Sequence, residues 1–197
     1  MKIILIVAIA ILTGCAARNQ PIAQKQRANP LENRFFRQKE LVEKETVLGE
    51  ASTNILDQGK NRVQNIKIAC EKTSGVEVKA GETFSFNSST GERNEENGYK
   101  NAPVIVDGEK SYGVGGGVCQ VSTTIYLAAL NSNLSVTEHH NHSEPVAYAP
   151  SGKDATVVYG VKDLKIRNNT DKSIYIYTWI ENEKVFAKII KKSIDIQ

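Results

Sequence analysis

The sequence predicts an α+β fold, a single compact domain of several short strands with two or three helices that follows an N-terminal signal and a linker. Alternating apolar residues, such as Val76/Val78 and Phe84/Phe86, are typical of short half-buried strands. Residues 120–130 instead carry apolar side chains at helical spacing, as do residues 58–72. The segment from 173 to 191 predicts a hairpin that closes the domain.

The first residues are typical of an export signal. Met1 and Lys2 give a short positive start, and residues 3–12 form an apolar run that is too short to span a bilayer. The tetrapeptide that ends at Cys15 (LTGC) resembles a bacterial lipobox. We therefore predict a lipoprotein signal peptide over residues 1–14 and a lipidated Cys15 that holds the chain on the extracytoplasmic face of the membrane. In the alternative, the signal is an ordinary secretory one and Cys15 is incidental.

Residues 15–44 are predicted to be a lipidated tether with a short helix. The stretch 16–30 is polar and contains Pro21 and Pro30, and residues 31–44 carry Leu31, Phe35 and Leu41 at helical spacing. Basic residues are concentrated in this segment. A solvated spacer is the simpler interpretation, and contact with anionic lipid or wall polymer is the alternative. Aromatic residues of the kind that stack on bases are not interleaved there, so we expect no nucleic-acid partner.

The remaining domain, residues 45–192, carries the other predicted elements. The whole chain is nearly balanced in charge, with 25 Lys and Arg against 22 Asp and Glu, so its charge favours no partner. After a strand at 46–55 and a helix at 58–72, residues 76–87 predict two strands about a turn. Further strands are expected at 103–107, 146–148, 155–159 and 164–167, and the final pair spans 173–180 and 184–191.

The segment 113–124 (GVGGGVCQVSTT) is the most informative one for chemistry. Four glycines precede Cys119, which predicts a turn that leads into the helix after it. The free N–H groups and the dipole at such a helix start favour a thiolate. The same residues also fit a glycine turn followed by a small, buried and inert cysteine. The local sequence leaves both interpretations open.

Cys70 and Cys119 remain once Cys15 is assigned to lipid. Two cysteines in an exported protein can form a disulfide, which would prevent Cys119 from acting as a nucleophile. Cys70 falls on an amphipathic segment with Val63, Ile66 and Ala69, where a buried apolar residue is expected. We favour two free thiols. The His and Cys spacing fits no metal site, so we expect neither metal nor other cofactor.

Seven short blocks occur in order and together resemble the VanW-domain family. The resemblance runs from about residue 46 to about residue 190. The blocks are GETFSFN (81–87), GER (91–93), GY with APV (98–104), GVGGGVCQVSTTIY (113–126), NHSEPVAY (141–148), GKDATV (152–157) and DLKIRNNT (163–170).

The resemblance implies an activity. VanW domains can act as L,D-transpeptidases, with the cysteine of the GGG-x-CQ-x-ST block as nucleophile, which here is Cys119. That implies acyl transfer on peptidoglycan stem peptides through a Cys119 thioester, giving 3→3 cross-links or, with water as acceptor, carboxypeptidase activity. The alternatives are a non-catalytic accessory lipoprotein that binds peptidoglycan or a glycopeptide and is linked to glycopeptide resistance, and a wall endopeptidase of the Cys/His type.

The partner of Cys119 is sought among three histidines clustered at 139–142. His142 lies in the block NHS and is the first candidate for the proton transfers, whereas it could instead cap a turn before Pro145. Glu138 or Asn141 is expected to orient its ring. His139 and His140 are expected at the surface or behind the site.

Smaller roles are assigned to other residues. The N–H groups of Gly116, Gly117 and Val118 are candidates for an oxyanion hole. Arg93 is a candidate for a substrate carboxylate, with an exposed ion pair as the equal alternative. Turn roles are expected for Asp154, Asp163 and Asn168–Asn169. The remaining candidates for binding or orienting substrate, each with local backbone bonding or core packing as the alternative, are Tyr99, Gln120, Ser122 and Thr123.

Overall fold

A computed structural model describes residues 41–106 and 109–196. These residues form nine strands and three helices in antiparallel sheets, which confirms the predicted α+β class. The predicted signal peptide, Cys15 and the linker 16–30 lie outside the described residues, as does most of the helix predicted at 31–44. The end of that predicted helix is wrong, because Leu41 already begins a strand.

Four strands form the main antiparallel sheet, in the order β1-β9-β8-β2. Its members are β1 (Leu41–Asn54), β2 (Val76–Val78), β8 (Ile174–Glu181) and β9 (Lys184–Ile196). The β8–β9 hairpin confirms the predicted one and turns at Asn182 and Glu183, both of which have positive φ. The register of β1 against β9 shifts between Val47 and Gly49. Gly49 is required there, because a Cβ atom would lie 2.7 Å from the Ala128 carbonyl oxygen.

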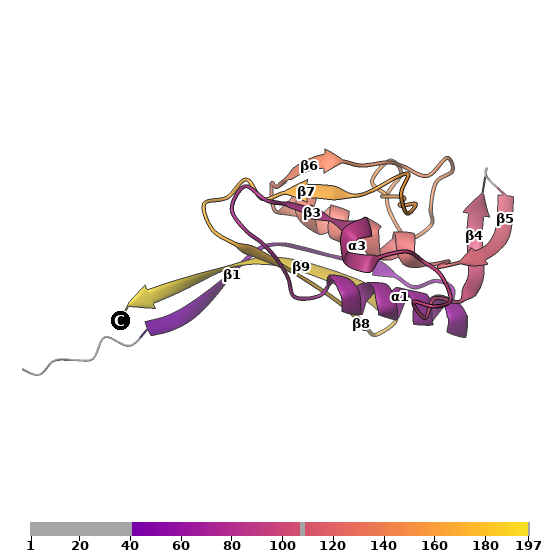
Figure 1. Ribbon diagram of the computed structural model, residues 1–197, viewed down its shortest axis with the longest axis horizontal. Helices are drawn as coiled ribbons and strands as arrows, with labels where there is room; N and C mark the ends of the chain where they lie inside the picture. Colours follow the sequence, from indigo (N-terminus) through magenta and orange to yellow (C-terminus); the bar gives the residue numbers. More distant parts are fainter. Residues whose placement is uncertain (1–40, 107–108, 197) are drawn as a thin grey trace, which may run out of the picture. The chain divides into compact units, whose positions relative to one another are not determined.

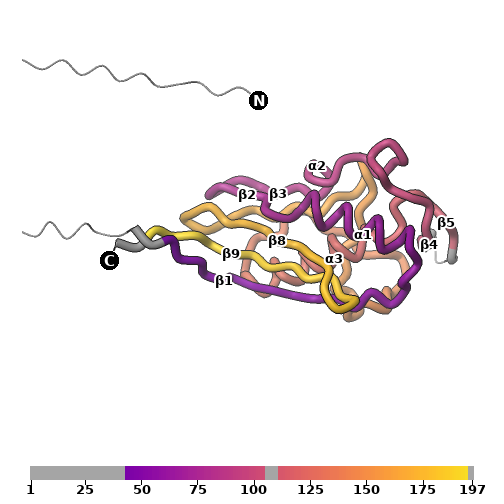
Figure 2. The backbone as a smooth tube through the Cα atoms, turned by 90° about the horizontal axis from the view of Figure 1, so that it is seen from below, coloured from indigo at the N-terminus to yellow at the C-terminus, as the bar shows by residue number. Residues whose placement is uncertain are grey.

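Two long helices, α1 (Lys60–Thr73) and α3 (Val118–Asn131), pack on this sheet. Figure 1 shows α3 between the main sheet and the smaller sheet that contains β6 and β7. Buried hydroxyl pairs fasten both helices to strands: Thr53 bonds Thr124 and Thr73 bonds Thr178, each at 2.8 Å between the oxygen atoms. The apolar core lies where these layers meet, and Figure 2 shows α1 running alongside β8.

The remaining strands form a three-stranded sheet, in the order β3-β7-β6, and a separate hairpin. The sheet contains β3 (Thr83–Ser85), β6 (Ser135–Glu138) and β7 (Lys165–Arg167), and the short α2 (Phe86–Thr90) follows β3. The hairpin is β4 (Asn101–Val106) with β5 (Glu109–Val114). β2 and β3 exist as predicted but do not pair with each other, since β2 pairs with β8 and β3 with β7.

Two predicted strands are wrong. Residues 146–148 and 155–159 are irregular, apart from one isolated bridge between Val158 and Lys162. The backbone of Ala155 is bonded to side chains of α3 instead of to a neighbouring strand. Alternating apolar residues here therefore reflect packing under α3 and not a sheet.

Candidate active site

A glycine turn carries Cys119 into the first turn of α3. Gly115 and Gly117 have φ of 88° and 105°, a left-handed conformation that favours glycine. Gly116 instead makes a close backbone approach, because a Cβ atom there would lie 2.5 Å from the Pro103 carbonyl oxygen. The turn thus fits closely against β4. The sequence prediction of a glycine turn that leads into a helix at Cys119 is confirmed.

Asn65 of α1 holds this turn from behind. Its side chain is fully buried and donates hydrogen bonds to the carbonyl oxygens of Gly116 and Lys100, both at 2.9 Å. Its own oxygen accepts the Lys100 N–H at 2.8 Å. One buried amide therefore joins the glycine turn, α1 and the start of the β4–β5 hairpin, which restricts the backbone before Cys119.

Cys119, His142 and Asp154 form a connected series of side chains. Cys119 and His142 line the same cleft, and each shifts the pKa of the other. The Nδ1 atom of His142 lies 2.6 Å from Oδ2 of Asp154, whose other oxygen accepts a hydrogen bond from Asn141 at 3.0 Å. The Cys119 sulfur also lies 3.7 Å from the Thr156 hydroxyl oxygen. The arrangement is the one expected of a candidate nucleophile, a base and an orienting carboxylate.

The electrostatics of this series favour an ion pair. Burial alone would raise the pKa of Cys119, but the hydrogen bond and positive charge of His142 outweigh it and lower the pKa below that of an ordinary thiol. Burial alone would lower the pKa of His142, but Cys119 and Asp154 outweigh it and raise that pKa. Burial likewise opposes ionisation of Asp154, and hydrogen bonds from His142 and Asn141 lower its pKa overall. A thiolate beside an imidazolium is the arrangement that these shifts stabilise.

Ser122 and Thr123 of α3 hold the segment that carries Asp154 and Thr156. Ser122 Oγ donates to the Ala155 carbonyl at 2.6 Å, and Thr123 Oγ1 accepts the Ala155 N–H at 2.9 Å. Both hydroxyls also lie within hydrogen-bond distance of the Cys119 carbonyl. Ser122 and Thr123, which the sequence predicts as candidates for substrate contact, are buried and join the helical turn of Cys119 to the segment of Asp154.

Sequence reasoning assigned Asp154 to a turn and missed its contact with His142. Asp154 is only 4 % exposed, and its carbonyl oxygen accepts a bond from Nε2 of His139 at 2.6 Å. His139 in turn stacks on Tyr126 with ring centroids 4.1 Å apart, so it supports the site from behind. One signal in the sequence could have indicated a role for Asp154 in the site. It lies within a family block (GKDATV) that also contains Thr156, whose hydroxyl lies beside the Cys119 sulfur.

Glu138 does not orient His142 as expected. Its carboxylate bonds to His140, the Asp163 N–H and Lys165, and these bonds, that from Lys165 most of all, lower its pKa to about 2. Asn141, the other candidate, acts on Asp154 and not on the ring. The orienting group of the imidazole is Asp154.

Tyr99 and Gln120 are held inside the domain; Gln120 borders the cleft over Cys119, whereas Tyr99 is not among its lining residues. Tyr99 is fully buried in the core, and Gln120 is fully buried at the end of β1, where Nε2 donates to the Asn54 carbonyl at 2.8 Å. The Gln120 Oε1 accepts a bond from Nη2 of Arg62 at 3.1 Å. Gln120, the residue after Cys119, is therefore bonded both to β1 and to α1.

Arg93 lines the cleft, but its guanidinium is already bonded. Nη2 donates to Asn87 Oδ1 at 2.6 Å and Nη1 donates to the Gly91 carbonyl at 3.0 Å. Burial lowers the pKa of Arg93, which the negative charge of Cys119 partly offsets. Arg93 thus contributes positive charge near the sulfur rather than a free bidentate site.

The backbone donors near Cys119 differ from those expected. The Val118 N–H is bonded to the Gly115 carbonyl at 3.1 Å, and the Gly116 N–H to the Gly113 carbonyl at 3.3 Å. The N–H groups of Gly117 and Cys119 have no hydrogen-bond partner among the described residues. The candidate oxyanion donors are therefore Gly117 and Cys119.

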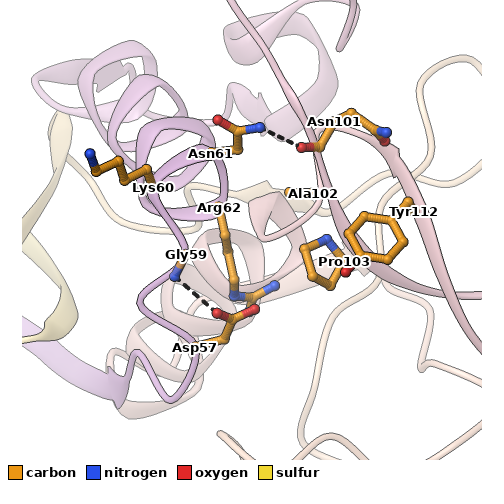
Figure 3. Close-up of a pocket in the computed structure, with 9 residues that line it drawn as sticks. All are labelled: Asp57, Gly59, Lys60, Asn61, Arg62, Asn101, Ala102, Pro103 and Tyr112. Carbon is orange, nitrogen blue, oxygen red and sulfur yellow. Dashed lines mark hydrogen bonds between the residues drawn. The ribbon is translucent and has the colours of Figure 1, made fainter.

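A cleft of about 990 Å³ lies over Cys119, with His142, Tyr148, Thr156 and Tyr159 among its lining residues. A second hollow of about 320 Å³ adjoins it between α1 and the β4–β5 hairpin (Figure 3). Asp57, Arg62, Pro103 and Tyr112 line both, so the two spaces adjoin at these residues. Cys70 is a separate free thiol, buried in the core, and no disulfide joins it to Cys119.

The family model described as VanW like protein matches residues 61–190. The chain belongs to the VanW family. It is 40% identical over 129 residues to the uncharacterized protein YoaR of Bacillus subtilis (strain 168), covering 66% of this chain and 43% of YoaR. It is 31% identical over 134 residues to the vancomycin B-type resistance protein VanW of Enterococcus faecalis (strain ATCC 700802 / V583), covering 66% of this chain and 49% of that protein. The chain thus spans less than half the length of either relative.

No solved structure matches this VanW-family chain significantly. Within residues 41–106 and 109–196, no helix is long and apolar enough to cross a membrane. The same residues contain no group of three or more His, Cys, Asp or Glu side chains placed to hold a metal ion.

Proposed function

We propose that this VanW-family protein is a cysteine acyltransferase that acts on peptidoglycan stem peptides as an L,D-transpeptidase. The observation that carries the proposal is the Cys119–His142–Asp154 series at the floor of an open cleft. A structural cysteine would be expected in apolar surroundings with a raised pKa, as Cys70 is. Burial acts on the Cys119 thiol too, but His142 beside it lowers the pKa of that thiol overall.

The first half-reaction forms a thioester. The Cys119 thiolate attacks the carbonyl carbon of the third stem residue, and the N–H groups of Gly117 and Cys119 stabilise the resulting oxyanion. The C–N bond to the terminal D-alanine then breaks, and the leaving amine takes its proton from the His142 imidazolium. The enzyme is left acylated on sulfur with a neutral imidazole.

The second half-reaction releases the acyl group. A side-chain amine of a neighbouring stem attacks the thioester carbon, its proton passes to His142, and the C–S bond breaks to restore the thiolate. The product is a 3→3 cross-link. Water in place of the amine gives a shortened stem and carboxypeptidase activity. No external energy source is needed, because one amide bond is exchanged for another.

The proposed location is the extracytoplasmic face of the cell membrane, with the chain anchored through a lipidated Cys15. The sequence of the first 15 residues supports this assignment. A multiply acylated cysteine anchors firmly, whereas a single acyl chain does so only marginally. Such a location gives the domain access to stem peptides, and the name of the Enterococcus relative, which concerns vancomycin resistance, is compatible with it.

The test is to incubate the full chain in detergent with disaccharide-tetrapeptide and to analyse the products by mass spectrometry. We expect 3→3 dimers with the wild type and none with Cys119→Ala. Equal behaviour of the two proteins would reject catalysis and favour a non-catalytic peptidoglycan- or glycopeptide-binding role. Purified sacculi that lose cross-links would instead indicate an endopeptidase.

A further inference from the structure

Arg62 places a positive charge at the junction of the two hollows. It projects from α1 and lines the smaller hollow (Figure 3), and it also lines the cleft over Cys119. Its stem lies under the glycine turn, since a Cβ atom on Gly117 would be 3.0 Å from Arg62 Cγ. The side chain is therefore held by packing along its length, which leaves the guanidinium in a defined position.

The guanidinium has donors to spare. Nη2 bonds to Gln120, whereas Nε is buried and has no hydrogen-bond partner among the described residues. Arg62 also forms no ion pair within this part of the chain. Asp57 lines the same hollow, but its Oδ1 accepts the N–H of Gly59 at 2.9 Å (Figure 3). A buried donor without a partner is rare, and a ligand oxygen is one way to satisfy it.

Arg62 and Cys119 line the same cleft. Gln120, the residue after Cys119, accepts a hydrogen bond from Arg62 Nη2 at 3.1 Å. A peptide with its scissile carbonyl over Cys119 would occupy this cleft, so the residue after that carbonyl has Arg62 among the side chains that line its space.

We propose that Arg62 binds the free C-terminal carboxylate of the departing stem residue, and that Gln120 orients the guanidinium for this contact. The inference deepens the proposed function, on which it rests. It replaces Arg93, whose terminal nitrogens are bonded to Asn87 and Gly91, as the carboxylate-binding arginine. The contact also predicts a specificity. An enzyme that binds the terminal carboxylate removes one residue from a free chain end and does not cut within a chain.

Binding to the full chain carrying Cys119→Ser tests this contact without any acyl transfer. The probes are a stem tetrapeptide with a free C-terminus and the same peptide as a C-terminal amide, each titrated by calorimetry. We expect the acid to bind about tenfold to a hundredfold more tightly, as for a charge-assisted hydrogen bond. Adding Arg62→Gln is expected to remove this preference, and Arg62→Lys to retain only part of it, because lysine keeps the charge without the planar fork.

Lys67→Gln is the matched control, because it removes one positive charge from an exposed position of the same helix. It is expected to leave the acid preference unchanged. Thermal unfolding of each variant shows whether it is folded. If Arg62→Gln does not fold, the test is made with Arg62→Lys. The third residue of a stem peptide can be a diamino acid with a carboxylate on its side chain. A third probe, amidated only on that side-chain carboxylate, identifies which carboxylate is bound.

Three results would overturn the proposal. They are equal binding of acid and amide, a preference for the acid that both Arg62 variants retain in full, and a preference that depends on the side-chain carboxylate instead of the C-terminal one. Failure of the proposed function gives a different pattern. In that case the wild type forms no transfer or hydrolysis product, whatever the outcome of the calorimetry.

Discussion

His142 donates to one oxygen of Asp154 twice, from Nδ1 of the ring at 2.6 Å and from its backbone N–H at 2.8 Å. These two bonds fix both the position of the residue and the tautomer of the imidazole, because Nδ1 must carry a proton to donate. The other ring nitrogen is left to face Cys119. The carboxylate therefore decides which atom of His142 takes part in proton transfer.

Replacement of His142 by alanine is expected to slow alkylation of Cys119 by iodoacetamide at pH 7 by about tenfold or more. Burial, which raises the pKa of the sulfur, would then act without the hydrogen bond and charge of His142, so the pKa of the thiol would rise. The measurement is the alkylation rate between pH 5 and pH 10. His140→Ala is the control, because His140 bonds to Glu138 and not to Cys119.

The same pKa shifts predict the form of the pH profile. The thiolate persists below the ordinary pKa of a thiol, and the imidazolium persists above the ordinary pKa of histidine. Activity is expected to rise as pH increases through the lowered pKa of Cys119 and to fall as pH passes the raised pKa of His142. A rate that tracks an unperturbed thiol, increasing steadily to high pH, would contradict an ion pair.

Asp154→Asn is expected to reduce turnover by more than tenfold while the fold is retained. The amide has nearly the shape of the carboxylate but lacks the charge that stabilises the imidazolium. Asp163→Asn is the matched control, since Asp163 is another buried aspartate, which binds Ser85 and the N–H of Asn87 instead of His142. If both variants lost turnover equally, the role of Asp154 would be structural only.

Cys70 is expected to stay unmodified under conditions that fully alkylate Cys119. Burial, with a smaller contribution from the charge of Glu71, raises the pKa of Cys70 to about 12. Its side chain is also only 3 % exposed, so reagent has little access. Peptide mapping by mass spectrometry after a short exposure checks this, and label on Cys70 in the folded protein would show that the core opens.

Gly116→Ala is expected to destabilise the domain by about 1–3 kcal/mol. The new methyl group would meet the carbonyl oxygens of Pro103 and Ala102, at 2.5 Å and 2.7 Å, and both are backbone atoms that cannot rotate away. Thermal or urea unfolding measures the effect. Gly113→Ala is the comparison, because its Cβ atom would lie at an ordinary distance of 3.5 Å from Val104, and an equal loss in both variants would contradict the role assigned to this approach.

Local patterns predicted α1, α3 and the β8–β9 hairpin well, because each buries one periodic face. The short elements β5, β6 and α2 were not predicted. Strand predictions failed at 146–148 and 155–159; at Ala155, hydroxyl groups of α3 take the place of a neighbouring strand. Position in the fold, which decides such cases, is not encoded in a window of a few residues.

The residues of the candidate site also differ in whether the local sequence could predict their positions. The glycine turn and Cys119 are local features, and their geometry follows from adjacent residues. Asp154 and Arg62 lie 35 and 57 positions from Cys119, respectively. Their contacts depend on how Ser122, Thr123 and Gln120 bond to distant segments. Buried polar side chains after the cysteine were the signal that such long-range contacts exist.

The position of the two hollows next to each other has a consequence for probe chemistry. Arg62 and Tyr112 belong to both spaces, and Cys119 lies in one of them. A compact molecule with an electrophile for sulfur and a carboxylate about one residue away would therefore be held at two points in this protein. Simple thiol reagents are held at one point only. Such bipartite molecules offer a route to selective covalent labels that distinguish this cysteine from other reactive thiols.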